Sequence, residues 1–177
     1  QTRLARVPGA DNLEPVMQIK NNDFNDLSSD LWGLYNLSNP GFDINVRPVW
    51  NEFTTGSSKV VVAVVDTGID LKHEDLAGNC LSTGHYNAVA GNTYIEAGDH
   101  GTHVAGTIAA VSNNGKGVAG IAGGDKANGM PGVKLMSCQI FGGDGVGSGG
   151  SSAVAIKHSA DNGAVISQNS WGYNYDA

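Results

Sequence analysis

The longest uninterrupted apolar run in the chain covers residues 60–65, is rich in valine and leads into Asp66. Because no polar residue alternates with the valines, the run predicts a strand that is buried on both faces, as in a parallel sheet. Residues 133–141 and 164–169 are two further apolar runs of strand length, and residues 80–87 form a weaker one. The pattern therefore predicts several short strands, and 164–169 is also expected to be buried.

Two segments between these runs have the period of amphipathic helices. Residues 100–111 form the first helix, and residues 151–162 form the second, which begins with a Ser-Ser cap and ends before Gly163. The residues expected on the buried stripes are Val104, Ile108 and Val111 in the first helix, and Ala153, Ile156 and Ala160 in the second. Strands that alternate with helices predict an α/β fold with a mainly parallel sheet flanked by helices.

Residues 1–58 show neither period and are rich in Asn, Asp and Ser. Trp32, Leu34 and Trp50 are scattered apolar positions within this polar segment. We therefore expect an irregular lead that wraps a domain rather than forming one.

Composition narrows the range of functions. Hydrophobic residues make up 40% of the chain, enough for a core at this length, and the 26 glycines show no period of three, which excludes collagen. The formal net charge is −7 and the 10 basic residues are scattered, so no nucleic-acid-binding surface is indicated. The longest apolar run is far shorter than the roughly 20 residues that span a bilayer, so no membrane span is expected.

Two further features concern processing and redox chemistry. Cys80 and Cys138 are too few for a disulfide framework or a cysteine zinc site, and two buried thiols are favoured over one bridge. The chain begins with Gln1 rather than Met, which indicates a processed N-terminus from which any targeting segment is already gone.

Asp66 and His100 are the residues that indicate chemistry. Asp66 follows the most buried predicted strand, at the carboxyl end where sites form in open α/β sheets. His100 opens a predicted helix, so its imidazole has a fixed direction. Such a histidine is suited to general base catalysis, and a buried aspartate that accepts from one ring nitrogen would fix its tautomer.

Each of these residues alone also fits a plainer role. Asp66 could cap the turn after its strand, and His103, inside the helix, is favoured as a structural residue. His100 and His103 could bind a metal ion together, but no third ligand stands at a convincing spacing. Asp66-Thr-Gly also occurs in aspartic proteases, although such a site needs two of these motifs and the chain has one.

Around these residues the chain resembles the subtilisin-like serine proteases. Val-Val-Asp66-Thr-Gly-Ile-Asp is similar to the aspartate motif of that family, and His100-Gly-Thr-His-Val-Ala-Gly-Thr-Ile matches its histidine motif almost letter for letter. Ser170-Trp-Gly172 resembles its substrate-binding segment. The lead, with Asn22-Asp23 followed by Leu31-Trp32-Gly33-Leu34, is similar to the start of many mature domains of the family.

The resemblance implies a subtilisin-like fold that is present here as an incomplete domain. Residues 1–21 would be a processed N-terminal lead or a propeptide remnant, and residues 22–177 the N-terminal part of a peptidase domain. It implies a serine endopeptidase with an Asp-His-Ser triad, in which Asp66 orients His100 and His100 is the general base.

The same resemblance implies how a polypeptide substrate is held, as an extended strand between two backbone segments. The residues implied in substrate binding are Phe141, Gly145, Val146, Gly147, Ser170, Trp171 and Gly172. Residues 145–150 also satisfy the G-x-G-x-x-G pattern of dinucleotide sites. The next predicted strand ends without the carboxylate that such a site needs, which argues against a nucleotide.

Residues 111–118 are similar to the calcium loop of the family. The implied ligands are the side chains of Asp23, Asp75 and Asn114 and the carbonyls of Val111, Lys116 and Val118. Such a set is typical of Ca²⁺, which takes six to eight oxygen ligands. Asn-Asn-Gly-Lys-Gly is also an ordinary turn, so a structural calcium ion and a metal-free turn both remain open. Catalysis itself is expected to need no cofactor.

The serine motif of the family, Gly-Thr-Ser followed by Pro-His, does not occur in the 177 residues. We therefore expect the serine to lie beyond the end of this chain, on its own C-terminal part, and the isolated chain to be inactive. The alternative is a catalytically silent scaffold of the same fold that binds peptides. The resemblance and the processed start imply a secreted or otherwise extracytoplasmic protein.

Overall fold

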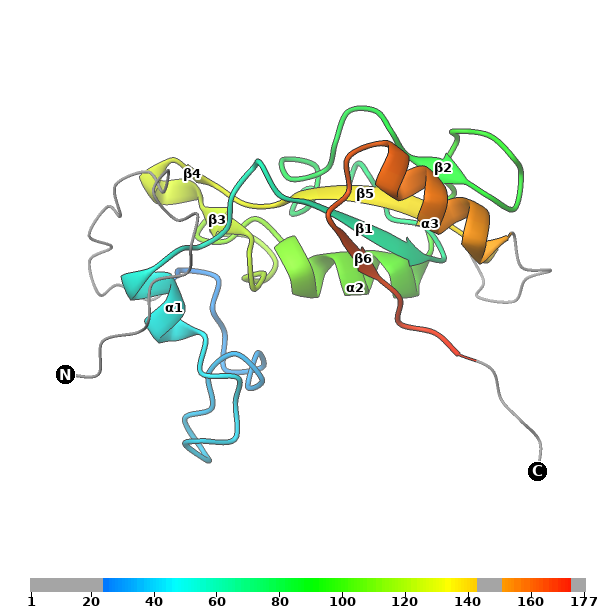
Figure 1. Ribbon diagram of the computed structural model, residues 1–177. Helices are drawn as coiled ribbons and strands as arrows, with labels where there is room; N and C mark the ends of the chain where they lie inside the picture. The colour runs from blue at the N-terminus through cyan, green and yellow to red at the C-terminus, as the bar shows by residue number, and fades with distance from the viewer. Residues whose placement is uncertain (1–23, 143–150, 173–177) are drawn as a thin grey trace, which may run out of the picture.

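The computed structural model describes residues 24–142 and 151–172 of the chain, which form a parallel sheet with helices on both faces (Figure 1). The sheet has four strands in the order β2-β5-β1-β6. The pairs β1·β5, β1·β6 and β2·β5 are all parallel, as the uninterrupted apolar runs predicted. The α/β fold with a mainly parallel sheet is therefore confirmed.

The two central strands are β1(Val61–Asp66) and β5(Lys134–Gln139), and in each only the first residue is not buried. They pair in register from Val61 with Lys134 to Asp66 with Gln139. Both lie where the apolar runs placed them. Burial on both faces explains why their sequences show no polar alternation.

The outer strands are shorter than the sequence predicted. Of the run 80–87, only β2(Tyr86–Asn87) is a strand, while Cys80 makes an isolated bridge with Leu135. The last strand is β6(Ile166–Gln168), whose pairing partner is β1. The prediction that 164–169 is buried is wrong, because β6 lies at the edge of the sheet. Val165 and Ile166 are 70% and 50% exposed.

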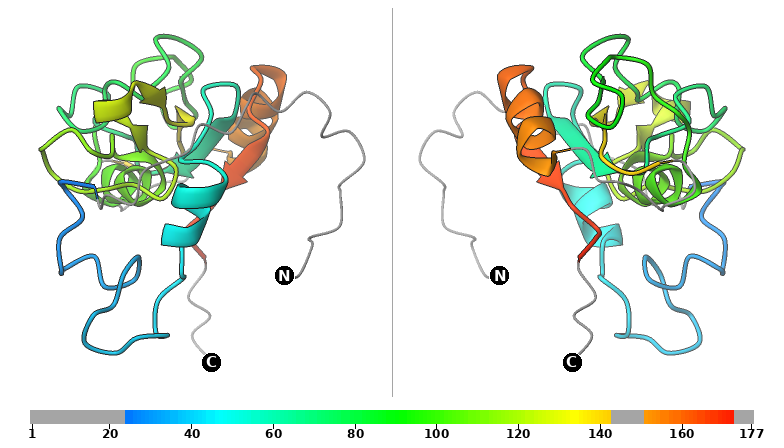
Figure 2. Two further views of the ribbon diagram at one scale, coloured as in Figure 1. Left: turned by 90° about the vertical axis from the view of Figure 1, so that its left-hand side faces the viewer. Right: turned by 90° about the vertical axis from the view of Figure 1, so that its right-hand side faces the viewer.

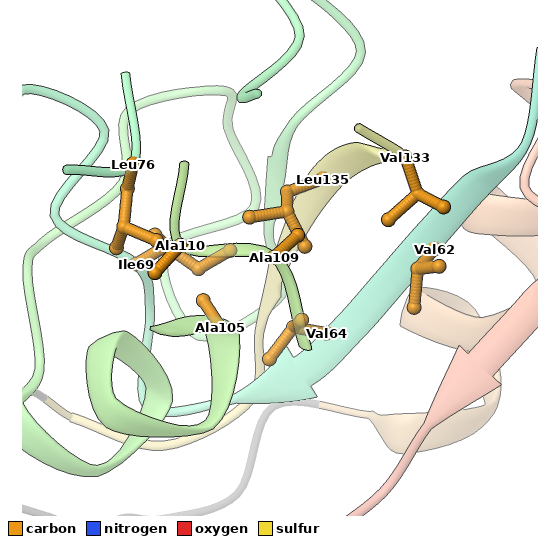
Figure 3. Close-up of a cluster of buried hydrophobic side chains, with 9 residues drawn as sticks. All are labelled: Val62, Val64, Ile69, Leu76, Ala105, Ala109, Ala110, Val133 and Leu135. Atoms are coloured by element: carbon orange, nitrogen blue, oxygen red, sulfur yellow. The ribbon is translucent and has the colours of Figure 1, made fainter. Parts of the chain in front are cut away.

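Helix α2(Asp99–Ala109) packs on one face of the sheet, but not through the predicted stripe. Its buried residues are Gly101, Ala105 and Ala109, whereas Val104 and Ile108 are only partly buried beside them. The small residues let the helix axis approach β1 and β5 closely, so the larger side chains lie at the margins of the contact. Figure 3 shows Ala105 and Ala109 against Val64 and Leu135 in this cluster.

Helix α3(Ser152–Asp161) covers the opposite face of the sheet (Figure 1). Its Ser151 cap is confirmed, since the Ser151 hydroxyl accepts from the Val154 N–H. The predicted stripe is wrong, because Ala155 and Ser159 are the buried residues. Ala153, Ile156 and Ala160 face away from the sheet and are exposed.

The described part of the lead, residues 24–58, is not wholly irregular. It contains α1(Arg47–Glu52), which has Pro48 in its first turn and buries Trp50. Trp50 packs against Phe24, with ring centroids 4.7 Å apart, and donates its indole N–H to the Ile121 carbonyl at 2.7 Å. These contacts fasten α1 to the domain. Between Phe24 and α1 the blue segment forms a long loop that extends away from the sheet (Figures 1 and 2).

A small antiparallel pair, β3(Gly124–Asp125) and β4(Met130–Pro131), lies beside the main sheet, and the 3-10 helix η2(Lys126–Asn128) joins its strands. The Asp125 side chain is buried and accepts from the Asn128 N–H. Asn113 also donates to Asp125, so this unit is tied to the loop that follows α2.

The two cysteines are free thiols, as predicted. Cys80 packs against the α2 side of the sheet and Cys138 lies in the α3-side cluster. Burial raises the pKa of Cys80 to about 11 and that of Cys138 to about 12. Both side chains are therefore protonated packing residues at neutral pH rather than nucleophiles.

His85 is a buried histidine whose hydrogen bonds fit the neutral ring. Its Nδ1 accepts from the Ser137 N–H at 3.0 Å, so Nε2 carries the proton and donates to the Leu81 carbonyl at 2.9 Å. Burial lowers the pKa of His85. The stabilisation from the neutral ring is complete above the unfolded pKa of about 6.5 and is lost as pH falls below it.

We therefore expect His85 to make the free energy of unfolding depend on pH in the acidic range. Replacing His85 by Gln should flatten the decline in stability between about pH 7 and pH 5, because the variant has no ring to protonate. Urea unfolding across this range measures it, with the exposed His103→Gln as control. An identical decline in His85→Gln and the unchanged protein would contradict the expectation.

Candidate active site

Asp66 and His100 meet at the carboxyl end of β1. Asp66 is the last residue of the strand, and His100 is the second residue of α2. The Asp66 Oδ1 and His100 Nδ1 atoms are 2.7 Å apart, with the aspartate side chain 2% exposed and the imidazole 56% exposed. The structure thus joins the two residues that the sequence selected.

Neighbouring residues hold the strand end and the helix start together. The Thr67 hydroxyl accepts from the Gly101 N–H at 2.9 Å, which satisfies one of the free donors in the first turn of α2. The Asp70 N–H donates to the Thr102 hydroxyl at 2.9 Å. A side chain at Gly101 would place its Cβ 2.5 Å from the Gly68 carbonyl oxygen, so this close approach requires glycine. The Asp66–His100 contact is therefore built into the packing of two elements.

The contact decides which ring nitrogen is free. The Asp66 Oδ1 also accepts from the Thr67 N–H at 2.7 Å, so the carboxylate acts as an acceptor here. His100 consequently carries its proton on Nδ1 and keeps an unprotonated Nε2. Because the imidazole is half exposed, Nε2 can take a proton from an incoming hydroxyl. A positive charge that forms on the ring is stabilised by the buried aspartate.

Of the residues predicted to bind substrate, the structure describes four. Phe141 and Trp171 are brought together, with ring centroids 5.9 Å apart in an edge-to-face arrangement. The Trp171 indole N–H donates to the Val65 carbonyl at 2.9 Å, directly before Asp66. Ser170 accepts from the Gln168 amide, and Gly172 has open space around it. Gly145, Val146 and Gly147 lie outside the described residues.

The predicted calcium loop gathers around a buried carboxylate. Asp75 Oδ1 accepts from the Asn114 Nδ2 at 2.7 Å, and its Oδ2 accepts from the Val118 N–H at 2.9 Å. The Val111 N–H donates to the Asp75 carbonyl at 2.8 Å. Lys116 turns its ammonium to Glu74, which lowers the pKa of Glu74 and raises that of Lys116. Five of the six predicted ligands therefore lie at one loop.

The sixth predicted ligand, Asp23, is outside the described residues, and a different aspartate of the lead reaches the loop. Asp26 is buried and accepts from the Asn113 and Asn114 N–H groups, both at 2.9 Å. The sequence held the signal, since only Phe24 separates Asn22-Asp23 from Asn25-Asp26. A pattern alone does not say which of two adjacent Asn-Asp pairs packs against a distant loop.

The loop has oxygen donors of the kind that calcium takes, and in the structure N–H groups occupy them. The donors are oxygens, Asp75 is an anionic buried carboxylate, and a side chain at Gly117 would place its Cβ 2.2 Å from Asp75 Oδ2. In the structure the amide nitrogen of Asn114 faces Asp75. The side-chain amide would therefore have to flip for its oxygen to bind a cation beside Asp75. Within the described residues no three His, Cys, Asp or Glu side chains gather as a metal site, so carbonyl ligands would be essential.

A buried aspartate against a half-exposed histidine, at the strand ends of an α/β sheet, is an arrangement that hydrolases with a nucleophile–histidine–acid site use. Comparison with known proteins gives the particular family. Residues 57–176 match the Subtilase family, Peptidase_S8. The chain belongs to the subtilase family.

Relatives of known structure and sequence agree with this assignment. Fervidolysin from Fervidobacterium pennivorans is 37% identical over 164 residues, which cover 85% of this chain and 21% of fervidolysin. The crystal structure of fervidolysin, described as a keratinolytic enzyme related to subtilisin, superposes with a TM-score of 0.57 over 85% of this chain and 22% of that one, at 31% identity. The thermophilic serine proteinase of Bacillus sp. strain AK1 is 31% identical over 88% of this chain and 39% of its own length.

The chain therefore spans between about a fifth and two fifths of the length of these curated relatives. In the described part of the chain, none of the helices is both long and apolar enough to cross a membrane.

Proposed function

We propose that this chain contributes the aspartate and histidine of a serine endopeptidase. One observation carries the proposal: Asp66 Oδ1 lies 2.7 Å from Nδ1 of a half-exposed His100, at the carboxyl end of the central strand. His100 takes the proton of the attacking serine through Nε2, and Asp66 holds the ring in the required tautomer. Membership of the subtilase family supports these roles.

The proposed substrate is a polypeptide. Phe141 and Trp171 meet edge to face near Asp66, which supports apolar walls for substrate side chains upstream of the scissile bond. Ser170 and Gly172 are exposed at the end of β6, where an extended peptide can pair with their backbone. Gly145, Val146 and Gly147 are proposed to pair with the other side of the same peptide.

The serine is proposed to come from a C-terminal part of the same protein that packs against this chain. The exposed apolar edge formed by Val165 and β6 supports such a partner, because a solitary parallel edge strand favours association. We also propose an extracytoplasmic location. Relatives such as the halolysin-like extracellular serine protease Nep of Natrialba magadii support it.

Hydrolysis of a chromogenic peptide tests the proposal. The 177-residue chain alone should be inactive, and activity should appear when it is produced together with a C-terminal part that carries the serine. His100→Ala should abolish that activity, whereas replacing the exposed His103 by Ala should leave most of it. Peptide binding without hydrolysis by the complete protein would indicate a silent scaffold instead, and turnover by the isolated chain would overturn the proposed source of the nucleophile.

We also propose that the loop 111–118 binds a structural calcium ion, with Asp26 in the place first assigned to Asp23. Asp75, Asn114 and the carbonyls of Val111, Lys116 and Val118 complete the donor set. An ion that binds only the folded protein stabilises it by about 2.7 kcal/mol when its free concentration is 100 times Kd.

Calcium should therefore raise the thermal midpoint by several degrees relative to the same protein in EGTA. Asp75→Asn should abolish the response, because the loop then loses its buried negative charge. Thermal scans with Ca²⁺, Mg²⁺ and EGTA measure this effect, and Asp70→Asn is the control. Equal midpoints with calcium and EGTA would show that the loop is a metal-free turn.

A further inference from the structure

Three buried polar side chains form a row across the carboxyl ends of neighbouring strands. Asp66 of β1 is the register partner of Gln139 of β5, which in turn is the register partner of Asn87 of β2. All three residues are at most 2% exposed. Partners in register project to the same face of a sheet, so the three side chains point to the side that α2 covers.

Each of these three side chains bonds to a different position along residues 94–100, the segment that leads into α2. The Asn87 Nδ2 donates to the Tyr94 carbonyl at 3.0 Å. The Gln139 Oε1 accepts from the Glu96 N–H at 3.0 Å. Asp66 takes the third point, the His100 ring. The aspartate therefore orients the imidazole, while the two amides hold the backbone that carries it.

The side chain of Gln139 makes a second hydrogen bond through its amide nitrogen. Its Nε2 donates to the Phe141 carbonyl at 2.9 Å, at the end of β5 where the proposed substrate-binding segment begins. One fully buried amide thus bonds the approach to His100 with its oxygen and the start of the substrate segment with its nitrogen. Without the amide, the Glu96 N–H and the Phe141 carbonyl lose these partners, and both segments are free to shift.

We propose that Gln139 is a positioning residue that sets the place of His100 and of Phe141 together, with Asn87 as its neighbour in the row. This inference rests on the proposed endopeptidase function. Gln139 is fully buried, so in this proposal it acts through other residues rather than on the substrate itself. Its oxygen acts on the chemical step through His100, and its nitrogen acts on substrate binding through Phe141.

Two substitutions in the complete protein separate these effects. Gln139→Met keeps the length of the side chain and removes both bonds, so kcat should fall by about tenfold to a hundredfold and KM should rise. Gln139→Glu keeps an oxygen for the Glu96 N–H and, in its ionised form, sets the other oxygen against the Phe141 carbonyl. It should restore most of kcat and leave KM raised by roughly tenfold.

A spectroscopic measurement tests the same inference without catalysis. The His100 Nδ1 proton, held by Asp66, should give a distinct downfield NMR signal. In Gln139→Met that signal should broaden by exchange with water, because the backbone that carries the ring is no longer fixed; in Gln139→Glu it should stay sharp.

Asn79→Leu is the matched control. Asn79 is also buried and donates to two backbone carbonyls, those of Ala109 and Gly123, both at 3.0 Å. These bonds hold the far end of α2, so the substitution should lower stability without changing KM or the His100 signal.

The inference is overturned if Gln139→Met keeps the parental kcat, KM and signal, or changes them no more than Asn79→Leu does. Failure of the proposed function is a separate outcome. If His100→Ala retains activity, His100 is not the general base, while the NMR signal still decides whether Gln139 positions the ring.

Discussion

Asp66→Asn is expected to lower kcat of the complete protein by about 10⁴-fold while leaving the fold intact. The Asp66 Oδ1 accepts the His100 Nδ1 proton across 2.7 Å, in a position only 2% exposed. An amide that presents its N–H to the ring forces the proton from Nδ1 to Nε2. The nitrogen that must accept the serine proton is then already protonated, and the reaction loses its base.

Peptide hydrolysis and ¹⁵N NMR of the imidazole measure the rate and the tautomer together. Asp70→Asn is the matched control, because Asp70 lies in the loop that follows Asp66 and its substitution removes the same charge. Its side chain accepts from the Lys72 N–H rather than from a catalytic group. Activity of Asp66→Asn within tenfold of the parent, with Nδ1 still protonated, would show that the aspartate does not orient the ring.

Leu135→Ala is expected to destabilise the domain by about 2–5 kcal/mol. Leu135 is fully buried in β5, at the centre of the cluster that joins the sheet to α2 (Figure 3). Its neighbours Val64 and Ala109 belong to a strand and a helix that cannot both close around the vacated space. A loss of this size is a large share of the 5–15 kcal/mol that stabilises a typical domain.

Urea unfolding measures this effect, with Leu37→Ala as the control. Leu37 is 70% exposed in the lead, so the same chemical change there should alter the free energy of unfolding by less than about 0.5 kcal/mol. Equal effects of the two substitutions would mean that the cluster around Leu135 does not carry the stability of the domain.

The sequence predicted the central strands well because their signal is local. A short run of apolar residues such as 60–65 predicts a strand that is covered on both faces. The strands β1 and β5 are buried in this way. The edge strand β6 was harder to predict. The run that contains it begins Ala164-Val165-Ile166, as apolar as the start of a central strand, and its place at the edge of the sheet leaves Ile166 half exposed.

In the helices, too, some features follow from the local sequence and others depend on the tertiary structure. Their positions and the Ser151 cap follow from local pattern, but the buried faces do not. Burial in α2 is decided by how closely the helix approaches β1, which favours Ala105 and Ala109 over Val104 and Ile108. The lead differs again. Trp50 was recognised as an apolar position, but the contact with Phe24 that fastens α1 to the domain joins residues far apart in the sequence.

The sequence alone determined the strand–helix alternation, the family resemblance and the pair Asp66 and His100, because these depend on residue order and on motifs of adjacent residues. Tertiary structure alone decided which helix faces are buried, that Asp26 reaches the loop 111–118, and that Gln139 bonds both the approach to His100 and the Phe141 carbonyl. The physical reason is the same in each case. Burial and hydrogen bonding depend on which distant segment lies opposite, and that is settled only when the strands pair and the helices close over them.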